Sequence, residues 1–127
     1  MIISDYQTLK DIQAEFHRTF PGLKIEFYAS PHQPGKGSPK REQIDPGLQL
    51  KFVRAKHTKG ELQLSPDMSV AELESALQEQ FGLHAQVFRK SGNLWMQTTS
   101  TDDWPLERQN RKGTASEAHY NEKQQDL

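Results

Sequence analysis

The chain has 127 residues, a formal net charge of −1, and a composition that is 33% hydrophobic and 26% charged. We expect one hydrophobic core, because two separate cores of about 60 residues would each be only marginally stable. The absence of cysteine excludes disulfide bonds, thiolate metal sites and thiol redox chemistry. No signal-peptide pattern or run of about 18 apolar residues occurs, so we expect a cytoplasmic protein that does not bind membranes.

Two segments carry apolar residues at the spacing of one face of an α-helix. In residues 9–20 and 70–81 these residues fall at positions i, i+3, i+7 and i+11. Thr8 and Ser69 precede the two segments, and each is followed three positions later by an acidic residue that can complete a capping box. Because Glu72 suits this box better than an aspartate, we expect Ser69 to form the better cap.

The two segments resemble each other beyond the helical pattern. A glycine follows each predicted helix, Gly22 in one case and Gly82 in the other, where it can end the helix in a left-handed conformation. Alternating apolar residues then predict strands over residues 23–27 and 83–87. This internal repeat of helix, glycine and strand has two explanations, a duplication or the coincidence of two generic amphipathic helices, and the sequence leaves both open.

The second predicted strand continues into the pattern of a β-hairpin. Ser91-Gly92 can supply the positive φ angles that a two-residue turn requires. This turn places Phe88 opposite Trp95 on one face and Val87 opposite Met96 on the other. Both faces of the hairpin then present apolar side chains.

Only one face of such a hairpin can cover the core. The other face is covered either by the C-terminal segment that carries Trp104 or by another protein chain. Exposed tryptophans are favoured at binding surfaces. We therefore take these as candidate partner-binding residues: Phe88, Trp95, Met96 and Trp104.

Proline and glycine are concentrated between the two halves, so residues 30–46 are expected to form a mobile loop. Alternating apolar residues around 48–52 and 62–64 predict two further strands. Together these elements predict an α+β fold of the ferredoxin-like kind. In that fold a two-layer sandwich has an antiparallel sheet of four or five strands, with the two main helices on one face.

The C-terminal region predicts a short helix and a tail. An acid before residues 104–112 can cap a helix there, a proline is tolerated in its first turn, and Gly113 can end it. Residues 114–127 have almost no apolar side chain to bury, so we expect a polar, disordered tail. The single domain is then residues 1–113.

Positive charge is concentrated in residues 31–60, where seven cationic residues face two acidic ones. Such a segment can neutralise phosphates, which supports a hypothesis of nucleic-acid or polyanion binding, although only Phe52 lies within it as an aromatic. The cationic residues are Lys36, Lys40, Arg41, Lys51, Arg54, Lys56 and Lys59.

The sequence contains no catalytic, cofactor or metal motif of useful specificity. Residues 35–38 lack the spacing of a phosphate loop, and the five histidines follow no ligand spacing. Helix capping explains the adjacent Asp102 and Asp103 more simply than acid-base catalysis. The leading hypothesis is a non-enzymatic module that self-associates, for example as a homodimer, or docks a protein partner through the hairpin. The alternatives are polyanion binding and a small enzyme whose pocket forms only in the fold.

Overall fold

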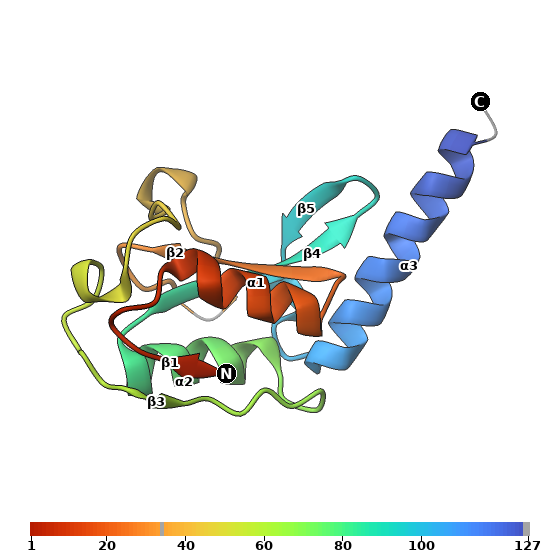
Figure 1. Cartoon of the computed structure of the whole chain (residues 1–127). Helices are drawn as coiled ribbons and strands as arrows, with labels where there is room; N and C mark the ends of the chain where they lie inside the picture. Colours follow the sequence, from red (N-terminus) through yellow and green to blue (C-terminus); the bar gives the residue numbers. More distant parts are fainter. Residues whose placement is uncertain (34, 126–127) are drawn as a thin grey trace.

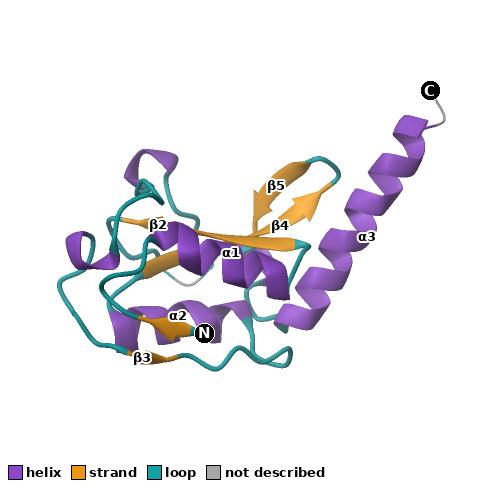
Figure 2. Ribbon diagram, in the orientation of Figure 1, coloured by secondary structure: helices purple, strands orange, loops and turns teal. Residues whose placement is uncertain are grey.

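The computed structural model describes residues 1–33 and 35–125 of the chain. Figures 1 and 2 show its helices and strands, which follow one another in this order: β1 (Ile2–Ile3), α1 (Leu9–Thr19), β2 (Leu23–Tyr28), β3 (Gly60–Glu61), α2 (Val70–Phe81), β4 (His84–Ser91), β5 (Leu94–Gln97) and α3 (Leu106–Gln125). Short 3₁₀ helices lie in the connections: η1 (Lys40–Glu42), η2 (Leu50–Phe52) and η3 (Thr99–Thr101). Within the described part, no helix combines the length and the apolar character needed to cross a membrane.

The described strands form two antiparallel sheets. Three of them make one sheet in the order β2-β4-β5, with Ile25 of β2 opposite Val87 of β4. The strands β1 and β3 form a separate sheet, with Ile3 opposite Gly60. The prediction of an α+β fold is therefore confirmed.

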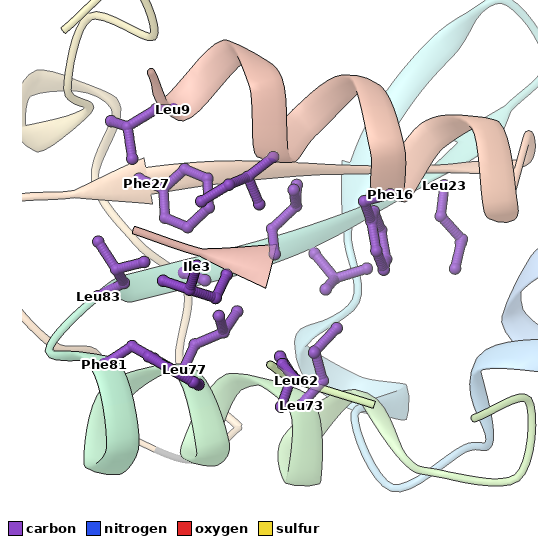
Figure 3. Close-up of a cluster of buried hydrophobic side chains, with 14 of the residues drawn as sticks. Ile3, Leu9, Phe16, Leu23, Phe27, Leu62, Leu73, Leu77, Phe81 and Leu83 are labelled. Carbon is purple, nitrogen blue, oxygen red and sulfur yellow. The ribbon is translucent and has the colours of Figure 1, made fainter. Parts of the chain in front are cut away.

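The hydrophobic core lies between α1 and α2. In the view of Figure 3, β2 and β4 pass behind it and β1 lies in front. The two helices bury the stripes that the sequence predicts: Leu9, Ile12 and Phe16 from α1, and Val70, Leu73, Leu77 and Phe81 from α2. Because burial of one such side chain contributes about 1.5–3 kcal/mol, these stripes hold both helices against the strands.

The predicted number of strands is wrong. Leu48, Leu50 and Phe52 alternate in the sequence, yet η2 forms here, with Leu50 buried and Phe52 69% exposed. The alternation reflects one buried leucine between two exposed side chains. Residues 62–64, the second predicted strand, instead follow the short strand β3, which pairs with β1, a strand that was not predicted. The larger sheet therefore has three strands instead of four or five, and the ferredoxin-like arrangement is also wrong.

The two glycines that follow the main helices have different roles. Gly82 adopts a φ of 66° and ends α2 as predicted. Gly22 is not in the left-handed region, and α1 ends at Phe20 instead. The Gly22 N–H donates a hydrogen bond of 2.7 Å to Asn110 Oδ1, so this glycine is where α3 contacts the turn before β2.

The helix α3 is longer than predicted. The structure carries it through Gly113 to Gln125, whereas the sequence predicted a short helix closed by Gly113 and a disordered segment after it. A side chain at Gly113 would collide with the carbonyl oxygen of Gly22, so the glycine permits a close crossing of two backbones. Figure 1 shows α3 running beside the β4–β5 hairpin, where the Gly92 N–H donates to Ser116 Oγ at 2.8 Å. The last two residues of the predicted tail lie outside the described residues.

The two halves of the chain also share backbone hydrogen bonds at matching positions. In each half, these bonds join the start of the main helix to the segment that follows its strand. In the first half, with the N–H donor named first, the bonds are Leu9 to Leu48, Lys10 to Pro46, Leu50 to Gln7 and Lys51 to Asp5. Their counterparts in the second half, in the same order, are Val70 to Trp104, Ala71 to Asp102, Leu106 to Met68 and Glu107 to Pro66. Each segment thereby inserts one fully buried leucine, Leu50 or Leu106, into the core.

Candidate functional site

The three-stranded sheet presents aromatic rings and lysines on the face turned away from the core. The Lys24 ammonium lies 5.1 Å from the centre of the Phe88 ring and 5.3 Å from that of Trp95. The Lys90 ammonium lies 4.7 Å from the Trp95 ring. Together with Lys40, which lines the same hollow as Phe88 and Trp95, these residues form what we call the aromatic–lysine surface.

Strand alternation places these residues on one face. Leu23 and Ile25 of β2 point into the core, so Lys24 between them points outward. On the hairpin, Phe88 lies opposite Gln97 and Lys90 opposite Trp95. The two aromatic rings are therefore diagonal neighbours on the same face.

The predicted hairpin turn is displaced by one residue, so each cross-strand partner is displaced by two: Met96 lies opposite Arg89 instead of Val87. Ser91 pairs with Leu94, so the loop consists of Gly92 and Asn93 instead of Ser91 and Gly92. The positive φ of 63° at Gly92 falls at the first loop position. Pairing Phe88 directly with Trp95 was consequently an error, although the shift leaves both on one face.

Hollows lie on both sides of Trp95. The first has a volume of about 250 Å³, and its lining includes Tyr28, Lys40 and Phe88. The second has a volume of about 310 Å³ and lies toward α1, with Lys10 and Lys24 in its lining. Trp95 thus borders two concave surfaces, and Lys24 and Glu26 also line both of them.

Carboxylates balance part of this positive charge. Lys24 Nζ lies 3.5 Å from Glu26 Oε1, and Lys90 Nζ lies 3.4 Å from Glu117 Oε2 of α3. Lys10 and Lys40 form no ion pair with any described residue. The surface around Trp95 therefore carries more cationic than anionic groups.

The other two predicted partner-binding residues lie elsewhere, around Arg89. This arginine is buried, donates to Gln109 Oε1 at 2.8 Å, and lies 3.7 Å from the sulfur of Met96. Trp104 lies close to two guanidinium groups, whose central carbons are 5.4 Å (Arg89) and 3.7 Å (Arg108) from the centre of its ring. The four predicted residues thus divide into two pairs, of which Phe88 and Trp95 belong to the aromatic–lysine surface.

The basic segment is distributed over different parts of the fold. Arg54 is buried, pairs with Asp5 at 2.9 Å and donates to the Phe81 carbonyl, so its charge is used inside the protein. Lys51 lies 4.9 Å from the Phe52 ring, away from the three-stranded sheet. Lys56 Nζ donates to the Glu79 carbonyl at the end of α2. The three remaining residues are exposed, with no described contact that joins them to one surface: Lys36, Arg41 and Lys59.

A second candidate site is a cavity of about 220 Å³ between α2 and the start of β4, which we call the α2 cleft. Its titratable side chains come from separate segments, which is why the sequence did not group them. Its lining residues are Pro31, His32, Ala71, Glu74, Ser75, Gln78, Glu79, His84, Ala85 and Asp102.

An internal ion pair forms the inner wall of the α2 cleft. Glu74 is 8% exposed, accepts the Val87 N–H at 2.9 Å, and lies 3.4 Å from His32 Nε2. The hydrogen bond from His32 to this carboxylate raises the pKa of His32 to about 9. Burial raises the pKa of Glu74 above its ordinary value, while His32 and the Val87 amide oppose that shift. The imidazolium thus ties residues 30–33 to α2, and its Nε2 atom also lies 3.2 Å from the Ala85 carbonyl oxygen of β4.

The pKa of the second imidazole of the cleft, that of His84, is shifted in the opposite direction. Burial lowers the pKa of His84, and the nearby positive His32 lowers it further. Its Nδ1 atom is buried and has no hydrogen-bond partner among the described residues. The cleft therefore holds a charged imidazole beside one that favours its neutral form, which is an arrangement able to bind polar groups.

The sequence contains one indication of this cleft, an acidic residue within the apolar stripe of α2. Glu74 lies four residues after Val70 and three before Leu77, so it belongs to the apolar stripe of α2. A carboxylate in a buried stripe requires an internal partner. The identity of that partner, His32, was not readable because it lies in the proline- and glycine-rich loop.

Across residues 1–33 and 35–125, no group of three or more His, Cys, Asp or Glu side chains is arranged to hold a metal ion. Comparison with known proteins gives no functional lead. No family, curated protein or solved structure matches the chain.

Proposed function

We propose that this chain is a non-enzymatic binding module that docks an acidic segment of another protein on the aromatic–lysine surface. The observation that carries this proposal is the position of two ammonium groups, those of Lys24 and Lys90, within 5.3 Å of the Trp95 ring. The aromatic side chains supply contact area, and the lysines supply charges complementary to carboxylates.

The excess of cations favours an acidic partner. Lys10 and Lys40 border the hollows beside Trp95 and have no carboxylate partner among the described residues. A segment bearing Asp or Glu can pair with them while an apolar side chain fills the hollow over Phe88. Such pairs raise the association rate and select against basic partners.

A protein segment fits this surface better than a single-stranded nucleic acid. Bases bind such sheets by stacking on open aromatic faces. Here the Lys24 ammonium already lies over both Phe88 and Trp95, so a base would have to displace it. Carboxylates instead approach the ammonium group from outside.

The test measures binding of a fluorescently labelled acidic peptide, with alternating Glu and Phe, by anisotropy at moderate salt. Trp95→Ala and Lys24→Gln should each weaken binding by about tenfold or more. The matched controls are Phe52→Ala and Lys51→Gln, which alter a similar lysine–aromatic pair away from the sheet and should leave affinity unchanged.

Three outcomes would contradict the proposal. Equal losses in the Phe52→Ala control would mean that binding is nonspecific. Tighter binding of labelled oligo(dT), with a steep dependence on salt, would favour the nucleic-acid hypothesis. A dimer seen by light scattering that Trp95→Ala dissociates would make a second copy of the chain the occupant.

We also propose that the two halves arose by duplication of one unit of strand, helix, strand and closing segment. The shared hydrogen bonds, such as Leu50 to Gln7 and Leu106 to Met68, support this origin. Two generic amphipathic helices would have no reason to share a closing segment that inserts a leucine at a matching position.

A further inference from the structure

The strand β5 lies at the border of the three-stranded sheet, with one edge bound to β4 and the other open (Figure 2). The Thr98 N–H donates to the Val87 carbonyl at 3.2 Å. In an antiparallel ladder this bond makes the neighbouring Phe88 and Gln97 a pair that exchanges no hydrogen bonds. The N–H and C=O of Gln97 therefore point away from β4, and those of Trp95, two positions earlier, point the same way. These four groups have no hydrogen-bond partner among the described residues.

The opposite border of the sheet, along β2, is covered by the chain itself. Residues 42–44 run beside its end. There the Ala29 N–H donates to the Glu42 carbonyl at 2.9 Å, and Ile44 donates to the Phe27 carbonyl at 2.8 Å. Charged residues or prolines commonly block an uncovered edge, but the four residues of β5 include neither. The edge of β5 is therefore the place where a further strand can be added.

The side chains on the two faces of β5 define what such a strand would carry. On one face, the ammonium groups of Lys24 and Lys90 lie 5.3 and 4.7 Å from the centre of the Trp95 ring. Because Trp95 belongs to the edge strand, a carboxylate opposite it in an added strand comes within reach of both ammonium groups. On the other face, Leu94 is 68% exposed and Met96 is 39% exposed, which favours apolar partners. A segment of alternating acidic and apolar residues therefore fits this edge.

The same charges disfavour a second copy of this chain as the occupant. Antiparallel pairing of two β5 strands about a two-fold axis perpendicular to the sheet places both aromatic–lysine surfaces on one side. The ammonium groups of Lys24 and Lys90 in each copy would then face the same groups of the other copy. An acidic segment replaces this repulsion with attraction.

We infer that the acidic segment binds as a fourth strand, antiparallel to β5, with its acidic side chains on the aromatic–lysine surface and its apolar side chains beside Leu94 and Met96. Its N–H and C=O groups at the acidic positions bond to those of Trp95 and Gln97. This inference rests on the function proposed above, because it states how the partner of the same surface is held.

Two N-methylated versions of the alternating Glu and Phe peptide test this pairing by anisotropy with the full-length protein. When the Glu side chains lie beside Trp95 in an antiparallel strand, the Glu N–H groups point to β5 and the Phe N–H groups point to solvent. Methylation of the Glu amides removes these donors and should weaken binding by about tenfold or more. Methylation of the Phe amides, the matched control with the same number of methyl groups, should weaken binding by less than about threefold.

Amide hydrogen exchange measured by NMR tests the protein side of the same bonds. The amides of Trp95 and Gln97 should exchange about tenfold more slowly when the unmodified peptide saturates the protein. Equal affinities of the two methylated peptides, or unchanged exchange at both amides, would overturn the inference but leave the proposed function intact. The absence of saturable binding by the unmodified peptide would overturn both. Protection of the two amides without peptide, lost on dilution, would make a second copy the occupant and overturn the inference as well.

Discussion

The two halves of this chain place a groove at matching positions but line it with opposite charges. Beside α1 the lining includes Lys10, Gln13, His17 and Lys24. Beside α2 the matching positions are Ala71, Glu74, Gln78 and His84, joined by Glu79 and Asp102. The backbone arrangement therefore determines where a groove forms, and the side chains at a few repeated positions determine what it can bind.

One helix position shows this difference most clearly. Gln13 of α1 donates to Glu26 Oε2 at 2.9 Å in a partly exposed contact. Glu74, at the matching position of α2, satisfies the Val87 N–H and binds His32. Gln13 thus stays near the surface of the first groove, whereas Glu74 holds residues 30–33 against the second.

Replacing these two residues should give the largest difference between the halves. Glu74→Ala removes the acceptor of the Val87 N–H and the charge partner of His32, and should lower the free energy of unfolding by about 3 kcal/mol. Gln13→Ala, the matched control, should cost less than about 1 kcal/mol because water can replace its contact. Urea denaturation measures both. Similar losses in the two variants would show that the two grooves are energetically equivalent.

The second half also carries the long helix α3, and its docking can be tested at Gly113. Alanine favours a helix by about 1 kcal/mol over glycine, yet a methyl group here would meet the Gly22 carbonyl oxygen. Overpacking commonly costs 1–3 kcal/mol, so we expect a net loss of roughly 1–2 kcal/mol for Gly113→Ala. Thr114→Ala, an exposed neighbour, should be neutral or slightly stabilising. If Gly113→Ala gained stability in thermal unfolding, α3 would not be docked on Gly22.

The charged histidine predicts a dependence of stability on pH that belongs to the second half. The pKa of His32 is raised from 6.5 to about 9 by Glu74, so the protonated ring stabilises the fold. This contribution is complete below about pH 6.5 and is lost as the pH rises through about 9. The other titratable groups that line the same cleft are Glu74, Glu79, His84 and Asp102. His32→Gln should flatten the free energy of unfolding across this window.

The control for this pH profile is His119→Gln, which removes an exposed imidazole from α3. It should leave the profile of the wild type unchanged. A wild-type profile that is already flat between pH 6.5 and 9 would mean that the fold does not hold His32 in its charged form.

The smallest predicted difference concerns the two helix starts. Thr8 and Asp11 form a reciprocal capping box, with bonds of 3.0 and 3.2 Å, whereas Ser69 accepts the Glu72 N–H with no return bond from that side chain. The expectation that Ser69 forms the better box is thus reversed. Asp11→Ala should cost about 0.5 kcal/mol more than Glu72→Ala, because only the former loses a hydrogen bond to the cap. Equal costs in chemical denaturation would show that the return bond contributes nothing.

Local patterns predicted the parts of the fold that depend on local sequence. The stripes of α1 and α2, the cap at Gly82 and the existence of the hairpin follow from periodicity and turn chemistry. The pairing of β1 with β3 joins two-residue strands from distant parts of the chain, and no periodicity is detectable over that length. The extension of α3 depends on tertiary contacts at Gly22 and Gly92, which its polar sequence does not reveal.

For the candidate surfaces too, the sequence predicted local features but not contacts between distant residues. Strand alternation placed Phe88 and Trp95 on one face, yet the lysine that joins them comes from β2, a pairing that required the sheet register. The basic segment could not show that Arg54 is internal, because its partner Asp5 lies far away in the sequence. Convergence of distant side chains was the missing information in both cases.

The crossing of Gly22 and Gly113 has a consequence for how this protein can change over evolutionary time. A side chain at Gly113 would meet the Gly22 backbone, and one at Gly22 would meet the α3 backbone at Asn110 and Thr114, so neither position can acquire a side chain while α3 stays in place. We therefore expect Gly22 and Gly113 to be retained together or lost together. A descendant that retains both keeps α3 seated on the turn before β2, and one that loses either must carry that helix elsewhere.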